Sequence, residues 1–413
     1  MSNYANTKPG SRLRIIVLGY IVRGPLGGLA WHHLQYVIGL SLLGHEVYFV
    51  EDSDDYEGCY DPQTGVTGPD PSYGLRFADQ AFKMAELQDR WAYYDAHRLR
   101  WHGPCAENIV GICEHADVLL NVSGVNPIRP WFGDIPIRVL IDTDPAFTQI
   151  RHLNDPAARQ LALKHNVFLT FAENFGTEGC VVPDDGLPWQ ATRQPVVLQA
   201  WPIVSAPKDG NFTTVMQWDS YKVREHNGIR YGMKSSSFEP YLNLPRYTDA
   251  GLELAVGSET APRDLLKANG WLVCDPLAVT RDLNTYRQYI QRSKAEFSIA
   301  KHGYVVTRSG WFSERSANYL ASGRPVLVQE TGFSRWMNTG AGVIRFNSPD
   351  EAIAGIEQIN GNYALHCEAA RAVAEEFFDS AAVLTSMIER ALQTAGSGAP
   401  QGCQDKDKTS DFM

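Results

Sequence analysis

The first fifty residues alternate between two kinds of hydrophobic pattern, and this alternation constrains the fold more than any other feature. Residues 13–21, LRIIVLGYI, are almost continuously apolar, which predicts a strand buried on both faces of a parallel sheet. A turn rich in Gly and Pro follows. Apolar residues then recur at helical spacing as far as Gly44, and a second apolar run covers residues 47–52. Strand, turn, helix and strand in this order predict an α/β unit with parallel strands.

Similar runs continue along the chain, whose 413 residues exceed what one ordinary core accommodates. We predict two tandem Rossmann-like, doubly wound domains facing a cleft, at residues 1–205 and 206–375, with a linker at 205–211. Residues 53–105 are expected to form an insertion over the first sheet, and residues 195–202 a further strand. A helix over about 350–391, broken near Gly361, is expected, and its part at 376–395 could cross back to the first domain. Residues 396–413 are polar and Gly-rich, which predicts a disordered tail.

Composition narrows the class of protein. The net charge of −10 argues against general nucleic-acid binding, because no bulk attraction to phosphate exists. No apolar run has the roughly 20 residues of a membrane span, and the N-terminus lacks the apolar segment of a secretory signal. The seven cysteines contain no C-x-x-C pair, which fits reduced thiols in a cytoplasmic protein. The oligomeric state stays open.

Two stretches resemble glycosyltransferases of the two-Rossmann (GT-B) fold, of the group 1 and spore-coat-maturation types. They are residues 24–50, GPLGGLAWHHLQYVIGLSLLGHEVYFV, and residues 308–356, which contain SGWFSERSANYLASGRPVLV. The resemblance implies a nucleoside-diphosphate sugar, with UDP or GDP, bound mainly by the C-terminal domain and an acceptor bound by the N-terminal domain. It also implies domain closure around the donor, and no obligatory metal or other cofactor.

One departure from that family bears on the activity. Many retaining members carry two glutamates eight residues apart before the Gly-x-Pro-Val corner, and these places hold Gly310 and Asn318 here. The stereochemical outcome therefore stays open. Two rivals also stay open: a nucleotide-sugar epimerase of the same fold, and a non-catalytic protein that binds a sugar nucleotide or a glycan, which the missing glutamates favour.

The stretch SERSANYLASGRPV suggests the phosphate site. Ser313 is a good N-cap, and the free N–H groups and dipole of the first helical turn favour an anion. Arg315 is predicted to add a two-pronged phosphate donor, and Asn318, or alternatively Glu314, to hold a ribose hydroxyl. The plainer alternative is an ordinary capped helix with a solvated Glu314–Arg315 pair.

The resemblance assigns further donor contacts. A basic residue after the first strand of the second domain, Lys234 or alternatively Arg230, would meet the diphosphate, and Asp275 would contact the base. A glycine pair at the start of the first helix lets a ligand approach the backbone. The remaining expected donor contacts are Gly27, Gly28, Lys301, Ser309, Gly310, Trp311 and Glu330.

Candidate catalytic residues lie in the first domain. Asp142 and Asp144 follow a predicted strand, at the end where ligands bind such sheets, and one of them could orient or deprotonate the acceptor hydroxyl. A D-x-D pair holds a metal in a different, single-domain glycosyltransferase fold, so we expect no metal here; a plain Asp–Pro turn is the alternative. His32 could be an acid/base group or, like His33, a packed or surface histidine. The acidic run 51–55, EDSDD, is expected to be a solvated loop.

Overall fold

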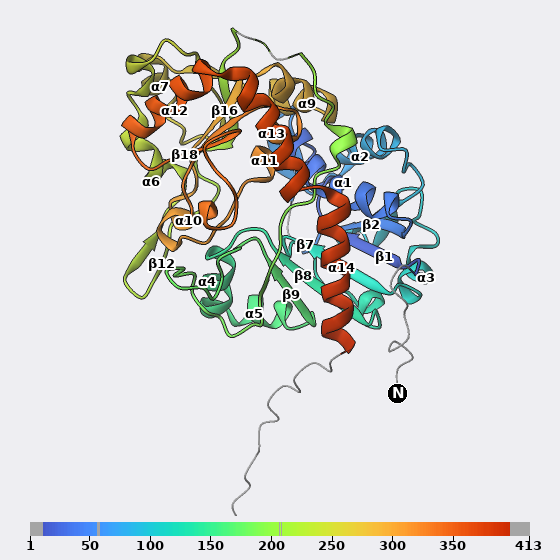
Figure 1. Cartoon of the computed structure of the whole chain (residues 1–413). Coiled ribbons are helices and arrows are strands. Elements are labelled where there is room, and N and C mark those ends of the chain that lie inside the picture. Colours follow the sequence, from blue (N-terminus) through green and yellow to red (C-terminus); the bar gives the residue numbers. More distant parts are fainter. Residues whose placement is uncertain (1–10, 56–57, 206, 208, 397–413) are drawn as a thin grey trace, which may run out of the picture.

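The computed structural model describes residues 11–55, 58–205, 207 and 209–396, and it contains two large sheets (Figure 1). The first has eight strands in the order β10-β9-β8-β7-β1-β2-β5-β6. In chain order they are β1 (Arg14–Leu18), β2 (Glu46–Asp52), β5 (Trp91–Asp95), β6 (Arg100–His102), β7 (Val118–Val122), β8 (Ile137–Asp142), β9 (Val167–Thr170) and β10 (Gln190–Ala191). All neighbours are parallel except the pair β5 and β6.

The second sheet has six parallel strands in the order β15-β14-β11-β16-β17-β18. They are β11 (Phe212–Gln217), β14 (Leu252–Gly257), β15 (Leu272–Cys274), β16 (Ala295–Ser298), β17 (Val326–Gln329) and β18 (Val343–Phe346). A strand order that runs outward from a first strand and then resumes on its other side is the doubly wound pattern. The predicted fold class of two tandem Rossmann-like domains is therefore confirmed.

Each sheet has a switch point, where the strand order reverses. In the first sheet it lies between β1 and β7, and in the second between β11 and β16. Ligands of doubly wound proteins bind outside the carboxyl ends of the strands at this point. The segments that follow these four strands are therefore where the functional residues are sought.

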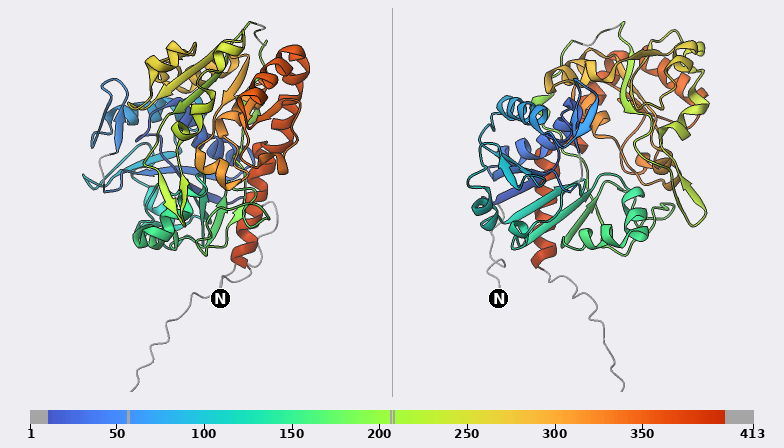
Figure 2. Two further views of the ribbon diagram at one scale, coloured as in Figure 1. Left: turned by 90° about the vertical axis from the view of Figure 1, so that its left-hand side faces the viewer. Right: turned by 180° about the vertical axis from the view of Figure 1, so that it is seen from behind.

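Helices cover the sheets (Figures 1 and 2). Those of the first unit are α1 (Gly27–Leu42), α2 (Ser72–Met84), α3 (Ile109–Glu114), α4 (Phe147–Asn154) and α5 (Pro156–Ala162). The second unit contributes α6 (Lys234–Phe238), α7 (Arg263–Ala268), α8 (Pro276–Thr280), α9 (Leu283–Arg292), α10 (His302–Thr307), α11 (Glu314–Ala321), α12 (Pro349–Gly361) and α13 (Tyr363–Phe377). None of the described helices is long and apolar enough to span a bilayer.

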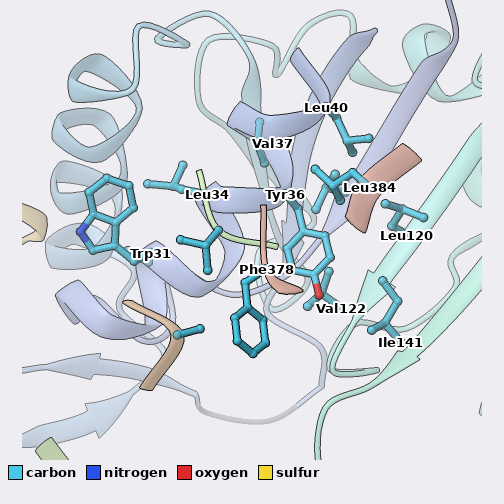
Figure 3. Packing of buried hydrophobic residues seen from close by; sticks show 14 of the residues in the cluster. Trp31, Leu34, Tyr36, Val37, Leu40, Leu120, Val122, Ile141, Phe378 and Leu384 are labelled. Atoms are coloured by element: carbon cyan, nitrogen blue, oxygen red, sulfur yellow. The ribbon is translucent and has the colours of Figure 1, made fainter. Parts of the chain in front are cut away.

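The last helix, α14 (Ser380–Gly396), returns to the first sheet (Figure 1). A methyl group added at Gly39 of α1 would lie 2.5 Å from Leu384 Cδ1, and Leu384 is fully buried. Figure 3 shows Leu384 and Phe378 among the buried side chains of α1 and of strands β7 and β8. Burying one such side chain stabilises the fold by about 1.5–3 kcal/mol. The predicted break near Gly361 is present, and a second, unpredicted break at residues 378–379 lets the chain cross. The predicted disordered tail lies, apart from Gly396, outside the described residues.

Two local predictions are wrong. Part of residues 53–105 extends the first sheet rather than covering it, because β5 pairs with β2, with Glu51 opposite Tyr93, and β6 continues the edge. The same stretch also forms the hairpin β3 (Cys59–Asp61) and β4 (Val66–Gly68). Residues 195–202 form a short 3-10 turn at Leu198–Ala200 instead of a strand. Val197 donates its N–H to Gln35 Oε1 at 2.8 Å rather than to a sheet.

Candidate functional site

The start of α11 has the predicted cap. Ser313 is its N-cap, and Ser313 Oγ accepts a hydrogen bond from Arg315 N at 3.2 Å. A small pocket adjoins this turn. Its lining includes Ser298 and Gln329, from the ends of β16 and β17, and the hydroxyl side chains of Ser313, Ser316 and Thr331. The capped turn therefore borders a small pocket of mixed polar and apolar lining on the ligand side of the second sheet.

Arg315 does not offer a free fork to that pocket. Its Nε donates to Glu296 Oε1 at 2.6 Å, Nη1 to the Val215 carbonyl at 3.0 Å and Nη2 to Ser298 Oγ at 2.6 Å. Burial works against the charge, yet Glu296 leaves the pKa of Arg315 raised above its ordinary value. The prediction of an open phosphate fork is wrong, and so is that of a solvated pair with Glu314, because the guanidinium bridges β11 and β16 internally.

Lys234 is the available cation at the second switch point. It is the first residue of α6, half-buried, and it makes no hydrogen bond or ion pair within the described parts of the chain. Burial, followed by the charges of Arg315 and Lys301, holds the pKa of Lys234 well below its ordinary value, while Glu296 and Glu314 oppose the shift. A positive charge that is desolvated, repelled and unpaired gains from an arriving anion.

Lys301 is paired across the two domains. It precedes α10, and its Nζ lies 2.9 Å from Asp144 Oδ1 and 2.9 Å from the hydroxyl of Tyr221. Tyr221 and Tyr304 both donate short hydrogen bonds to the Asp144 carboxylate. Since both oxygens of Asp144 already accept bonds, the prediction that Asp144 is a free base is not supported by this geometry.

Asp142 is a buried structural group. Its Oδ1 accepts from Thr148 Oγ1 at 2.6 Å and Asp144 N at 2.9 Å, and its Oδ2 accepts from Thr170 Oγ1 at 2.7 Å and Gln149 Nε2 at 3.0 Å. Burial raises the pKa of Asp142, although each of the four hydrogen bonds acts to lower it. With 2 % exposure and both oxygens bonded, Asp142 has no oxygen free to take a proton from an acceptor hydroxyl. Among the described residues no group of three or more His, Cys, Asp or Glu side chains could hold a metal ion.

The predicted donor loop 309–311 contacts both domains, and within the second domain Gly310 N donates to the Thr331 carbonyl at 2.8 Å. Asn174 N donates to the Ser309 carbonyl at 3.0 Å, and Trp311 Nε1 donates to the Thr143 carbonyl at 3.2 Å. Gly310 has a φ of 78°, and a methyl group there would lie 2.8 Å from Asn174 Cγ. Only Gly allows this approach at no cost. Trp311 also lines the pocket beside Ser313.

The glycine pair and Asn318 hold the domains together on the other side. A methyl group at Gly27 would lie 2.3 Å from the Asp282 carbonyl oxygen, and one at Gly28 would lie 3.2 Å from the Tyr286 ring. Asn318 is 1 % exposed, and its Oδ1 accepts from Gln35 Nε2 at 3.0 Å. The predicted ribose contact of Asn318 is therefore wrong, because its side chain is buried against Gln35. Gly27 and Gly28 were expected to approach a ligand, and here they allow close packing of residues 282–286.

His32 faces the second domain from α1. Burial lowers the pKa of His32, and the charge of the half-buried Glu314 opposes that shift. His32 makes no hydrogen bond to another described residue. Its neighbour His33, in contrast, is a packed histidine of the buried core. His33 is fully buried, neither ring nitrogen has a partner among the described residues, and burial holds its pKa well below the ordinary value.

Two further predicted contacts have local partners. Asp275 is exposed and caps α8 by accepting from Leu277 N at 2.9 Å. Glu330 Oε1 accepts from Gly332 N at 2.6 Å, and its Oε2 lies 3.8 Å from Arg345 Nε. Their bonding therefore ties both carboxylates to their own loops rather than to the start of α11.

The sequence reasoning missed Glu51, which is fully buried and not part of a solvated loop. Its Oε2 accepts from Ile21 N at 2.6 Å and Val22 N at 2.7 Å, and its Oε1 accepts from Arg23 N at 2.7 Å. These N–H groups belong to the turn after β1, the turn that binds phosphate in other doubly wound proteins. The position of this acidic residue at the end of the second predicted strand was the one sequence feature that could have indicated its role.

No protein-family model matches the chain, and no curated protein matches it. Solved structures do. An alpha-glucosyltransferase in complex with UDP-glucose and DNA containing an abasic site is 10 % identical, with a TM-score of 0.57 over 92 % of this chain and 100 % of that one. Anabaena HepE in complex with UDP-glucose is 12 % identical, with a TM-score of 0.55 over 93 % of this chain and 100 % of that one. At such identities the likeness concerns architecture, and with the two facing switch points it shows that this chain has the GT-B fold.

Proposed function

We propose that this protein is a glycosyltransferase that moves a sugar from a nucleoside-diphosphate sugar to an acceptor still to be identified. The observation that carries the proposal is the contrast between the two switch points. In the first, the Glu51 carboxylate occupies the backbone N–H groups that would bind phosphate. In the second, Lys234 is unpaired within the described parts of the chain, and the charges of Arg315 and Lys301 act on it. The first arrangement offers a diphosphate no free N–H group at these three residues, whereas the cation of the second attracts it.

UDP is the first nucleotide to test, and GDP the second. The two similar structures named above are complexes with UDP-glucose. The DNA of the first complex is not proposed as a partner of this chain, because a net charge of −10 disfavours a polyanionic acceptor.

The described residues support a division of labour. Lys234 and the capped first turn of α11 stabilise the leaving diphosphate, which develops charge as the sugar departs. His32 is neutral near pH 7 because burial lowers its pKa, so it can accept a proton from an acceptor hydroxyl. Glu314 lies near both groups and is available to a sugar or ribose hydroxyl. Asp275, Glu330 and the Ser309–Trp311 loop are proposed as outer contacts of the bound donor.

Nucleotide binding tests the proposal. Isothermal titration should detect UDP or GDP, and the same ligand should raise the melting temperature, because it binds the folded state only. Lys234→Met should weaken binding about tenfold, the loss expected for one charged hydrogen bond. Lys267→Met, at an exposed position on α7, is the matched control and should bind as the wild type does. The proposal fails if no nucleoside diphosphate binds at millimolar concentration.

Incubation with UDP-glucose alone separates this activity from its rivals. A transferase releases UDP and free glucose slowly, as water replaces the acceptor. An epimerase changes the sugar instead, and a binding protein returns the donor intact despite tight binding.

A further inference from the structure

A single carboxylate joins the two domains on one side of the molecule. Asp144 follows β8 in the first domain, and the three groups that donate to it all belong to the second domain. They are the ammonium of Lys301 and the hydroxyls of Tyr221 and Tyr304. The Lys301 ammonium also lies 4.5 Å from the ring centroid of Tyr221 and 5.2 Å from that of Phe147 on α4.

The first domain is shaped to present this carboxylate. Asp142, whose four acceptor positions are all used, receives the N–H of Asp144 and so fixes the loop. Two residues further on, Ala146 has φ 71° and ψ −50°, a region that residues other than Gly rarely adopt. Strained backbone persists where the surroundings impose it, and it is concentrated at functional positions.

The second domain supplies its donors from the edges of the switch point. Tyr221 belongs to the segment after β11, and Lys301 and Tyr304 belong to the segment after β16. Between Tyr221 and α6 the chain forms the hairpin β12 (Arg224–His226) and β13 (Ile229–Tyr231). Figure 1 shows this hairpin and α10 beside α4, away from the crossing between α13 and α14.

The chain crossings between the domains form a hinge on one side of the molecule, and the contacts of Asp144 close the opposite side. The chain passes between the domains near residues 201–205 and again at 378–379, and the close packing of α1 against α9 is on the side of those crossings. The contacts of Asp144 lie on the far side, together with the neutral hydrogen bonds of Asn174 to the carbonyls of Arg308 and Gly332. Asp144 therefore meets its three donors on the side away from the crossings, beside the packing of Phe147 against Tyr304.

We propose that Asp144 is a positioning residue that latches the domains in the closed state, and that its release opens the cleft for substrate exchange. Lys301 is the charged partner of this contact, since its ammonium lies 2.9 Å from Asp144 Oδ1. The coupling to substrate rests on the proposed function, whereas the latch itself does not.

X-ray scattering in solution tests the latch without any assay of activity. Asp144→Asn keeps the shape and removes the charge, and we expect a larger radius of gyration than for wild type. Hydrogen exchange of the amides at residues 224–231 should become about tenfold faster, as for a segment that has lost its docking contact. Asp134→Asn, at an exposed position of the same domain, is the matched control and should change neither quantity.

Lys301→Met should open the protein as Asp144→Asn does, and the double variant should add little, because the two changes remove one contact. If Asp144→Asn does not fold, Tyr221→Phe tests the same contact with a smaller change. Unchanged scattering and exchange in Asp144→Asn and Lys301→Met would overturn the proposal. So would an Asp144→Asn protein that stays closed and loses turnover, since that result identifies a catalytic base. A latch without nucleotide binding would refute the proposed function only.

Discussion

The guanidinium of Arg315 and the carboxylate of Glu296 form an ion pair inside the second domain, with Nε and Oε1 2.6 Å apart and exposures of 9 % and 0 % for the two side chains. Glu296 Oε2 has no hydrogen-bond partner in the described structure. The pair is therefore the main compensation for burying this carboxylate.

Removing Arg315 should destabilise the fold more than it affects any ligand. Arg315→Ala leaves Glu296 buried and unpaired, which costs about 3–5 kcal/mol of unfolding free energy. Arg315→Ala combined with Glu296→Gln should recover part of that loss. Urea unfolding measures both, and Arg281→Ala, whose ion pair with Asp282 is exposed, should change stability by about 0–1 kcal/mol. Equal stabilities of Arg315→Ala and Arg281→Ala would contradict the internal role.

Diphosphate binding should take up a proton. The pKa of Lys234 is depressed in the free protein, so part of the population is neutral at alkaline pH, and a bound diphosphate favours the ammonium. Affinity should therefore fall as the pH rises through the depressed pKa of the free lysine, because the free lysine then loses its proton. Titration calorimetry in buffers of different ionisation enthalpy measures the uptake. The uptake attributed to this group should vanish in Lys234→Met, and its persistence there would point to another residue.

The approach of α1 to α9 depends on Gly27. Gly27→Ala places a methyl group 2.3 Å from a backbone oxygen of Asp282, and the resulting shift should cost about 1–3 kcal/mol. The matched control is Gly111→Ala in α3, where no atom lies within 4 Å of the added methyl group, and this change should stabilise by about 0.5–1 kcal/mol. Thermal unfolding of the two variants should shift in opposite directions. Shifts of the same sign would argue against the close approach.

Asp142 should contribute to the stability of the fold and should not be needed to bind a metal ion. Asp142→Ala removes the acceptor of four donors and should cost about 3 kcal/mol or more, because those donors lose their partner in a buried site. Activity should survive EDTA, since the oxygens of Asp142 and Asp144 already accept bonds from the protein. Complete loss of activity in EDTA, restored by manganese, would show that these bonds rearrange around a cation.

Local patterns were sufficient for much of the fold and little of the site. The runs at β1, β7 and β8 are mostly apolar because both faces of these strands are buried, so they could be recognised without partners. Ser313 as a cap was equally local, since its bond spans two residues. Strand β5, which lies between β2 and the edge strand β6, has the sequence WAYYD, lacks such a run and was missed.

The wrong site assignments have one cause. Asn318 finds its partner Gln35 283 residues away, and Asp144 finds Lys301 157 residues away. Nothing near these residues in the sequence indicates such partners. Glu51 was taken for part of a solvated acidic run, although the strand that carries it is buried to its last residue.

The return of α14 to the first sheet sets the order in which the molecule can be completed. Leu384, Met387 and Ile388 close the core over α1, yet they are made after the entire second domain. At about 5–20 residues per second, a ribosome needs roughly 10–40 s to pass from the end of the first sheet to the end of this helix. During that interval the growing chain exposes an apolar face that its own last segment will cover, and the first domain to be synthesised is the last to be finished.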